Sequence, residues 1–319
     1  MTRRAVIRGT GHYLPERIVE NAWFEDRIDT SDEWIRTRTG IERRHFAAES
    51  ETTSQMAIKA AEQALSRAGI EARQLDAIVV ATSTPDLTFP SVATMVQSGL
   101  GVTNSFAFDI QAVCAGFIFA LANADGLIRS GQANRVLVVG SETFSRLMDW
   151  QDRATCVLFG DGAGAVVLEG ANSESGILAS DLNSDGSYRD ILYVDGGVST
   201  TGTSGKLRMQ GNILFRHAVE KLSETAHKAI EKADLTTGQI DWLVPHQANA
   251  RIISATAQRM NLPMEKVVLT VADHGNTSAA SIPLALSVAD QAGTFTKGDI
   301  IVTEAIGGGL SWGSVVLRW

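Results

Sequence analysis

The fold is decided by residues 106–121, which read FAFDIQAVCAGFIFAL. A short apolar strand ends near Ile110, passes through a turn of small residues, and leads into an uncharged helix that begins around Cys114. The same order of strand, small-residue turn and helix returns at residues 268–286, VLTVADHGNTSAASIPLAL. Alternating strands and helices are typical of a layered α/β fold. Their return in the second half of the chain predicts that this fold contains two similar units.

Two further pairs of segments support the duplication. A helix, a polar stretch and a strand occur in that order twice, at residues 60–84 and 225–249. A strand, a glycine-rich turn and a closing strand also occur twice, at residues 136–168 and 300–317. The separations between matching elements are similar, although the residues themselves are mostly different. The repeat therefore indicates a duplicated architecture.

The predicted elements divide into two halves, at residues 1–172 and 173–319. Strands are expected at short apolar runs, namely residues 76–81, 105–110, 135–139, 163–168, 242–244, 267–271, 299–302 and 313–317. The clearest helices are expected at residues 52–68 and 214–233. The polar, glycine-containing segment 182–205 is expected to form a long loop or lid.

The composition excludes several functional classes. The chain has 319 residues, of which 44% are hydrophobic and 20% charged, as in ordinary globular proteins. No apolar run is long enough to cross a bilayer, and residues 1–8 lack the apolar core of a secretory signal, so we expect a cytoplasmic protein. The net charge of −8 argues against nucleic acid as the main partner. The two cysteines, Cys114 and Cys156, are too few for a disulfide framework and too far apart for a metal knuckle.

Cys114 is the first candidate catalytic residue. A thiol at a helix N-terminus faces unpaired backbone N–H groups and the positive end of the helix dipole. Both favour the thiolate, so we expect a pKa below the free value of about 8.5. The small neighbours Ala112, Ala115 and Gly116 leave room for a substrate. Taken alone, the segment also fits a buried structural cysteine.

Two polar clusters follow predicted strands in the second half. His246 stands in the sequence VPHQAN, residues 244–249, directly after an apolar strand. Ligands in α/β folds bind beyond the carboxyl ends of strands, although a hydrogen-bonded structural histidine would also fit. Asn276 lies in the turn at residues 273–281, where Gly-Asn-Thr-Ser is also ordinary turn and cap chemistry.

A run of three glycines, residues 307–309, follows a predicted strand near the end of the chain. Its spacing matches neither a dinucleotide-binding motif nor a P-loop. Successive glycines let backbone N–H groups approach a ligand oxygen closely, as an oxyanion site requires. A plain flexible turn would have the same sequence.

Taken together, these segments resemble the β-ketoacyl-acyl carrier protein synthase III family, which initiates bacterial type II fatty acid synthesis. The motifs that carry the resemblance occur in the family's order along essentially the whole chain, at residues 9–15, 30–35, 38–41, 245–249, 275–281 and 307–313. The resemblance implies the thiolase-type fold, with duplicated βαβαβαββ halves in five layers, αβαβα. It also implies a homodimer and an acyltransferase activity.

The family's catalytic triad is Cys-His-Asn, and its roles fall on Cys114, His246 and Asn276. The resemblance implies that Cys114 takes an acyl group from acyl-CoA, while the backbone N–H groups of Cys114 and Gly308 hold the oxyanion. Malonyl-acyl carrier protein then loses CO₂, and the enolate receives hydrogen bonds from His246 and Asn276. Because decarboxylation supplies the carbanion, no strong base is required. No cofactor or metal is expected, since acyl-CoA is a substrate.

The resemblance also assigns the substrate contacts. The adenine of CoA is expected to stack between Trp34 and Arg153, and its phosphates to meet Arg38. The pantetheine tunnel is expected to be lined by Met209, Gly211, Phe215 and Ala248.

The acyl pocket is expected to involve Phe89, reaching across the dimer, and Ile306, which stands where many relatives carry phenylalanine. Phe89 matches short-chain-preferring relatives and therefore predicts an acetyl-CoA starter. Acyl carrier protein is acidic, so a basic patch is needed to bind it; the candidates are Arg216, Arg251 and Arg259.

Three other functions remain open at this stage. A member of the same superfamily could condense other thioesters in secondary metabolism. A Cys-His-Asn hydrolase would use the histidine as a base and water as the acceptor. A non-catalytic acyl-CoA-binding protein would tolerate the loss of Cys114.

Overall fold

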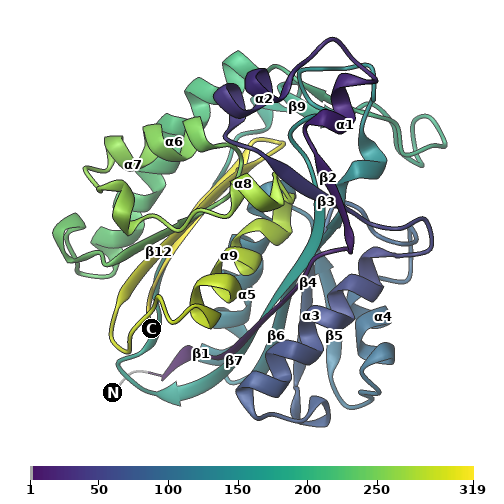
Figure 1. Cartoon of the computed structure of the whole chain (residues 1–319). Coiled ribbons are helices and arrows are strands. Elements are labelled where there is room, and N and C mark those ends of the chain that lie inside the picture. Colours follow the sequence, from purple (N-terminus) through teal and green to yellow (C-terminus); the bar gives the residue numbers. More distant parts are fainter. Residues whose placement is uncertain (1–2) are drawn as a thin grey trace.

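Two mixed β-sheets form the frame of the computed structural model, which describes residues 3–319 (Figure 1). The first sheet has the order β1 (Arg3–Tyr13), β7 (Asp161–Asn172), β6 (Arg135–Thr143), β4 (Ala77–Ala81) and β5 (Phe106–Ile110). The second has the order β11 (Trp242–Pro245), β12 (Ile300–Gly307), β13 (Ser311–Arg318) and β8 (Gly176–Ser184). Each sheet contains parallel pairs of strands. In the first sheet β4 runs parallel to both β5 and β6, and in the second sheet β11 runs parallel to β12.

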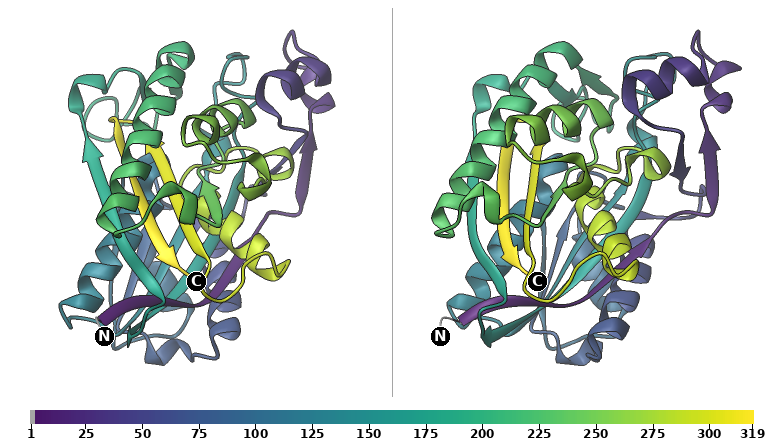
Figure 2. Two further views of the ribbon diagram at one scale, coloured as in Figure 1. Left: turned by 90° about the vertical axis from the view of Figure 1, so that its left-hand side faces the viewer. Right: turned by 60° about the vertical axis from the view of Figure 1, so that its left-hand side comes forward.

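Three layers of helices enclose these sheets, which gives the predicted order αβαβα. The outer face of the first sheet is covered by α3 (Thr53–Ala68) and α4 (Val92–Gly99). The outer face of the second sheet is covered by α6 (Gly211–Lys232), against which α7 (Ala250–Arg259) packs. Between the sheets lie α5 (Gly116–Arg129) and α9 (Ser281–Gln291), as the turned views of Figure 2 show. The thiolase-type fold is confirmed.

The remaining elements are short and lie mostly above one end of the sheets (Figure 1). They are α1 (Ala22–Glu25), α2 (Asp32–Thr39), α8 (Val271–His274), β2 (Arg17–Glu20), β3 (Arg43–Phe46), β9 (Leu192–Val194) and β10 (Leu207–Met209). The predicted lid at residues 182–205 is thus partly ordered into the end of β8 and the whole of β9. No helix in the described part of the chain is long and apolar enough to span a membrane.

The helix predicted at residues 52–68 is confirmed as α3. Thr52 accepts a hydrogen bond from Gln55 N–H, and the Gln55 side chain accepts one from Thr52 N–H, which completes a capping box. At the other end Gly69 takes a left-handed conformation, with φ of +64°. The buried face of α3 consists mainly of alanines, so the helix can lie close to the first sheet.

The strand predicted at residues 267–271 is wrong. Only Val267 forms a bridge, to Leu243, and Val268 N–H donates to Leu243 O at 2.9 Å. The buried side chain of Gln247 replaces the rest of the ladder: its amide donates to Val268 O, and its oxygen accepts from the N–H groups of Thr270 and Val271. A side chain that satisfies these backbone groups leaves no need for a paired strand.

The two halves share the central part of the hydrophobic core. The chain passes from the first sheet to the second between Asn172 and Gly176. However, α9 from the second half packs on β1 and β7 of the first sheet, and α5 from the first half contacts β12 and β13 of the second. Division of the chain at residue 172 stays a prediction about duplication: outside the shared centre, the first half has an apolar cluster of its own, and a second cluster belongs almost entirely to the second half.

A glycine at the centre of this core provides a test of the packing. A Cβ on Gly164 of β7 would lie 2.5 Å from the carbonyl carbon of Pro283 in α9. We expect Gly164→Ala to lower the free energy of unfolding by about 1–3 kcal/mol, as overpacking does. Urea unfolding followed by circular dichroism measures the change.

Gly126, inside α5, is the matched control. No atom lies within 4 Å of the Cβ that Gly126→Ala would add. This substitution should raise the free energy of unfolding by about 0.5–1 kcal/mol through helix propensity. Equal effects of the two substitutions would contradict the packing argument.

Candidate active site

Cys114, His246 and Asn276 line one cavity with a volume of about 230 Å³. Cys114 lies in the short turn between β5 and α5, His246 directly follows β11, and Asn276 lies between α8 and α9. Each side chain is at least nine-tenths buried. The structure thus brings together the three residues that the sequence singled out from separate segments. Their chemical roles stay predictions.

The two turns that carry Cys114 and Asn276 have matching backbone conformations. Val113 and Ser278 have φ values of +49° and +51°, and the 3-10 turns that contain them contact each other. A positive φ is unfavourable for a β-branched residue such as Val113. Such conformations persist only where the surrounding packing fixes them, and they cluster at functional sites.

The glycine run passes directly beside the cysteine turn. A Cβ on Gly307 would lie 2.6 Å from Ala112 O and 2.7 Å from Cys114 N, so a larger residue would push the strand away from the turn. Gly308, the predicted second oxyanion donor, follows it and faces Leu192 O. The sequence singled out Gly307 only as part of the glycine run; the reason why this position must be glycine appears when β12 and the cysteine turn are seen together.

Burial dominates the electrostatics of Cys114. It raises the pKa of the thiol to about 12; the Ser278 side chain opposes this shift, and nearby Glu142 adds a smaller contribution in the raising direction. The lowered pKa expected from the helix N-terminus is therefore wrong for this structure. At this pKa the thiol is predominantly protonated at physiological pH.

Glu142 is a buried residue of the site that sequence reasoning missed. Its carboxyl group accepts hydrogen bonds from Thr84 Oγ1 at 2.6 Å, Ser83 N–H at 3.1 Å and Ser278 Oγ at 3.2 Å. Burial raises its pKa to about 7. A glutamate at the end of the apolar strand β6 was the available signal. Glu142 joins the turn of Asn276 to the end of β4.

His246 is held in a neutral state. Its Nδ1 lies 2.6 Å from Ser281 Oγ, and its backbone N–H donates to Glu304 O at 2.8 Å. Burial lowers the pKa of its imidazole to about 3, so the ring is uncharged at physiological pH. Because Nδ1 is hydrogen-bonded to Ser281, only Nε2 of the neutral ring is available to interact with a ligand in the cavity.

The amide of Asn276 is oriented by its own turn. Its Oδ1 accepts a hydrogen bond from Ser278 N–H at 2.9 Å, which leaves the NH₂ group for the cavity. Its backbone pairs with residues 158–160: the N–H donates to Leu158 O, and its O accepts from Gly160 N–H. Asn276 is therefore placed as a hydrogen-bond donor.

The walls of the cavity contain most of the residues predicted to bind CoA. Arg38, Met209, Gly211, Phe215 and Ala248 all line it, as does Ile306 of the predicted acyl pocket. Arg251, predicted to bind the carrier protein, also lies in the wall, with its guanidinium 5.6 Å from the centre of the Phe215 ring.

The other predicted contacts lie outside this cavity. Arg216 and Arg259 are exposed on α6 and α7, and Phe89 is 83% exposed at a distance from its own chain's cavity. Trp34 and Arg153 are also outside, but they contact each other, with the guanidinium 4.9 Å from the indole centre. Arg38 lies on the same indole, at 5.6 Å, and connects it to the cavity.

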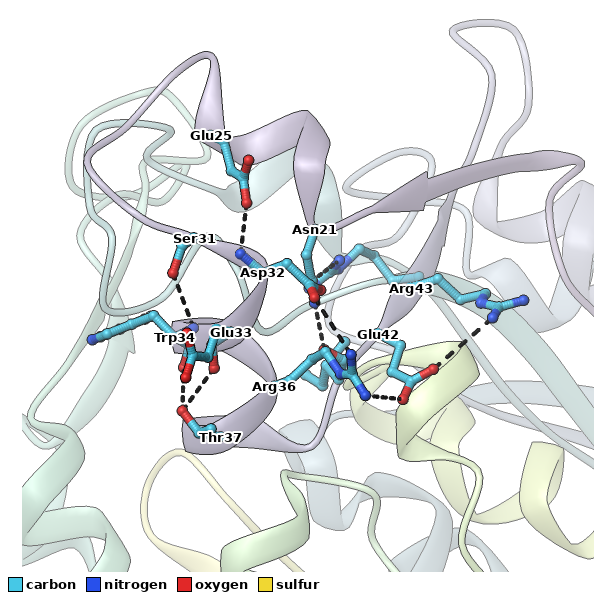
Figure 3. Close-up of polar contacts among 12 residues, drawn as sticks. Asn21, Glu25, Ser31, Asp32, Glu33, Trp34, Arg36, Thr37, Glu42 and Arg43 are labelled. Atoms are coloured by element: carbon cyan, nitrogen blue, oxygen red, sulfur yellow. Dashed lines mark hydrogen bonds and ion pairs between the residues drawn. The ribbon is translucent and has the colours of Figure 1, made fainter.

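Helix α2 carries Trp34 and Arg38, and polar contacts fix its position (Figure 3). Ser31 Oγ accepts from Trp34 N–H at 3.1 Å, which caps the helix. Asn21 donates to Asp32 at 2.9 Å, and Arg36 pairs with Glu42 at 3.3 Å (Figure 3). The helix is thereby anchored on the side of the molecule where the cavity opens.

A second cavity, of about 350 Å³, lies on the other side of the cysteine turn. Val113, Phe144, Leu147 and Leu207 give it an apolar wall, and Leu192 separates it from the first cavity because it lines both. Sequence reasoning missed Phe144 and Leu147, for which the only signal was their position just after β6. No cluster of three or more histidine, cysteine or acidic side chains in residues 3–319 is arranged to hold a metal ion.

Family models and related proteins show the similarity of this chain to a single family of synthases. Residues 108–186 match the model of 3-oxoacyl-[acyl-carrier-protein] synthase III, and residues 230–319 match the model of its C-terminal part. The β-ketoacyl-[acyl-carrier-protein] synthase III of Paracoccus denitrificans (strain Pd 1222) is 74% identical, with 99% of this chain and 100% of that protein covered.

Solved structures show the same fold. The crystal structure of 3-oxoacyl-[acyl-carrier-protein] synthase III from Aquifex aeolicus VF5 has a TM-score of 0.95 and 47% identity, covering 99% of this chain and 100% of the other. The priming β-ketosynthase from the R1128 polyketide biosynthetic pathway has a TM-score of 0.94 but 35% identity, covering 99% and 97%.

The raised pKa of Cys114 gives a pH prediction. Alkylation by iodoacetamide requires the thiolate, so its rate at Cys114 should rise about tenfold per pH unit from about pH 6 to about pH 10, with no plateau. The measurement is intact-mass analysis over time in a Cys156→Ser background, because Cys156 is the other free thiol. A plateau below about pH 8 would show that the helix N-terminus outweighs burial.

Proposed function

Because the chain belongs to the 3-oxoacyl-[acyl-carrier-protein] synthase III family, and is therefore an acyltransferase of the initiating condensation in fatty acid synthesis, we propose that it performs this condensation through an acyl-Cys114 intermediate. The observation that carries the proposal is the meeting of Cys114, His246 and Asn276 in one cavity. The substrates are a short acyl-CoA, with acetyl-CoA favoured by Phe89, and malonyl-acyl carrier protein.

The first half-reaction transfers the acyl group to the enzyme. Cys114 Sγ attacks the thioester carbonyl, the carbonyl electron pair moves onto the oxygen to form an oxyanion, and the thiol proton is released to solvent, from which the departing CoA sulfur later takes one up. We assign the backbone N–H groups of Cys114 and Gly308 to that oxygen. Collapse of the intermediate breaks the bond to CoA sulfur, which leaves as free CoA after taking up a proton.

The second half-reaction forms the carbon–carbon bond. Malonyl-acyl carrier protein loses CO₂, and the electron pair of the broken bond forms an enolate at the thioester oxygen. His246 Nε2–H and the Asn276 amide donate hydrogen bonds to this oxygen. The enolate carbon then attacks the acyl-Cys114 carbonyl and displaces the sulfur. Decarboxylation supplies the carbanion, so we assign no resident cofactor.

The geometry supports a route for CoA. The pantetheine arm would follow the wall of Met209, Gly211, Phe215 and Ala248, with Arg38 near the phosphates. Adenine would enter between Trp34 and Arg153, which now contact each other, so the guanidinium must move aside. The apolar second cavity, with Phe144 and Leu147, suits the acyl chain of the starter; Ile306 borders the thiol side.

The exposed edge of the first sheet supports the proposed homodimer. Strand β5 pairs only with β4 among the described residues, and the stacked rings of Phe106 and Phe108 lie along it. Phe89 and Leu87 are exposed in the loop that joins β4 to α4. An apolar edge strand is normally covered. Pairing with a second copy would cover it and would bring Phe89 to the partner's acyl pocket. We place this enzyme in the cytoplasm, with acyl carrier protein as its partner.

The neutral histidine favours condensation over hydrolysis. A Cys-His-Asn hydrolase needs the imidazole to accept a proton, but burial lowers the pKa of His246 to about 3. Such a ring is a poor base and a suitable neutral donor. The second alternative, condensation of other thioesters in secondary metabolism, is less well supported because the polyketide enzyme is the more distant relative.

Separating the half-reactions tests the proposed roles. Cys114→Ala should form no acyl-enzyme but should still decarboxylate malonyl-acyl carrier protein, because His246 and Asn276 remain. His246→Ala should form the acyl-enzyme but release CO₂ about 10²–10³-fold more slowly, as expected when one preorganised donor is lost. Intact-mass analysis and CO₂ release measure the two steps.

Three outcomes would contradict these roles. Full-rate decarboxylation by His246→Ala would remove His246 from the second step. Hydrolysis of acyl-CoA without malonyl consumption would favour the hydrolase. Normal condensation by Cys114→Ala would exclude the acyl-Cys intermediate.

Charge reversal on α7 tests the carrier-protein surface. Arg259 is exposed and outside the cavity, so Arg259→Glu should raise the KM for malonyl-acyl carrier protein roughly tenfold at low salt, with a smaller effect at high salt. Transfer from acyl-CoA to Cys114 should be unchanged. Arg251→Glu should impair both steps, since Arg251 lines the cavity.

Arg73→Glu is the control for net charge. Arg73 is exposed in the short turn after α3, on the opposite outer layer. Arg73→Glu should leave both acyl transfer to Cys114 and the KM for malonyl-acyl carrier protein unchanged. An equal rise in KM from Arg73→Glu and Arg259→Glu would show an effect of overall charge and not of a docking surface.

A further inference from the structure

Ser281 makes a hydrogen bond to the Nδ1 edge of the His246 ring. Its Oγ lies 2.6 Å from His246 Nδ1, and both residues are almost fully buried. Ser281 is the first residue of α9, so its backbone is fixed by the central helical layer. The contact is therefore shielded from solvent.

The direction of this hydrogen bond follows from the neighbours of Ser281. Gln247 N–H points at the same oxygen, at 3.3 Å, and can only donate. The serine hydroxyl has one proton, and within residues 3–319 the single acceptor in reach of Oγ is His246 Nδ1. If the ring donated from Nδ1, the serine proton would be buried without an acceptor, which is unfavourable. The serine is therefore the donor and Nδ1 the acceptor.

We propose that Ser281 is a positioning residue that fixes His246 in the tautomer with its proton on Nε2, and so makes the imidazole a hydrogen-bond donor toward the cavity. The inference rests on the proposed function, in which His246 Nε2–H stabilises the enolate. A neutral imidazole has one donor and one acceptor nitrogen, and the bond made by one decides the role of the other. Without the serine, the ring could present a lone pair to the enolate oxygen and repel it.

Gln247 makes the arrangement rigid. Besides its N–H, which contacts Ser281, its side chain bonds to Pro245 O, Val268 O and the N–H groups of Thr270 and Val271. These bonds immobilise the segment that follows β11. Ser281 and His246 consequently approach each other from two fixed elements.

The direct test is the tautomer itself. In free enzyme labelled with ¹⁵N-histidine, the His246 ring signals, identified by their absence in His246→Ala, should show a protonated Nε2 and a bare Nδ1. This measurement needs no variant of Ser281 and no activity. A proton on Nδ1 in the wild-type enzyme would overturn the proposal.

Variants of Ser281 link the tautomer to the reaction. Ser281→Ala should give a mixture of tautomers and slow CO₂ release from malonyl-acyl carrier protein at least about tenfold, a part of the 10²–10³ expected for complete loss of a donor. Acylation of Cys114 by acyl-CoA should be unchanged. Ser281→Thr, which keeps the hydroxyl, should restore the Nε2–H signal. Unchanged tautomer and rate in Ser281→Ala would refute the role.

The same helix offers a matched control. Ser287 of α9 is also buried, its Oγ lies 2.9 Å from His12 Nδ1, and it accepts a second bond, from Gln291. Ser287→Ala removes an equivalent serine–histidine contact away from the cavity and should leave the His246 signals and CO₂ release unchanged. An equal loss of rate in this control would indicate general damage to α9 and would overturn the assignment.

Failure of the proposed function would look different. A wild-type enzyme that never consumes malonyl-acyl carrier protein would disprove the condensation. The tautomer measurement on the free enzyme would still decide the direction of the Ser281–His246 hydrogen bond.

Discussion

The structure depends on the contact between two turns in the central layer, that of Cys114 between β5 and α5 and that of Asn276 between α8 and α9. Each turn contains a residue with positive φ, Val113 or Ser278, and each leads into one of the two helices between the sheets. A small residue also lets β6 approach the Asn276 turn: a Cβ on Gly140 of β6 would lie only 3.1 Å from Ala280 Cα. Because α5 and α9 each pack against both sheets, the position of the thiol relative to the amide is fixed by the whole core.

Burial then decides the protonation states. Burial raises the pKa of Cys114 to about 12 and that of Glu142 to about 7, and it lowers that of His246 to about 3. Glu304 in β12 follows the same rule, with a pKa raised to about 8. A site with these values favours neutral groups. Its means of stabilising a developing anion are therefore N–H dipoles fixed by packing, which act strongly where water is excluded.

The sequence predicted the layered fold, because apolar strands and amphipathic helices such as α3 have a clear period and clear caps. It also predicted which three residues meet, through a resemblance that extends over the chain. It failed where long-range contacts replace local signals. The strand at residues 267–271 is absent because the Gln247 side chain takes its hydrogen bonds. Glu142 and the specific requirement for glycine at position 307 could not be predicted, since only folding places β12 beside the cysteine turn and β6 beside the Asn276 turn.

The error in the pKa of Cys114 has the same origin and bears on mechanism. A helix N-terminus lowers a thiol pKa, but here burial of the sulfur acts in the opposite direction and outweighs it. The energy of forming the thiolate must then be recovered as the sulfur bonds to the substrate carbonyl and the charge moves to the oxyanion. The proposed oxyanion donors are the backbone N–H groups of Cys114 and of the glycine run. They stabilise negative charge on the carbonyl oxygen better than negative charge on the sulfur. We therefore expect the buried thiol to react slowly with small reagents in solution, and the proposed oxyanion donors to favour a thioester held in the cavity.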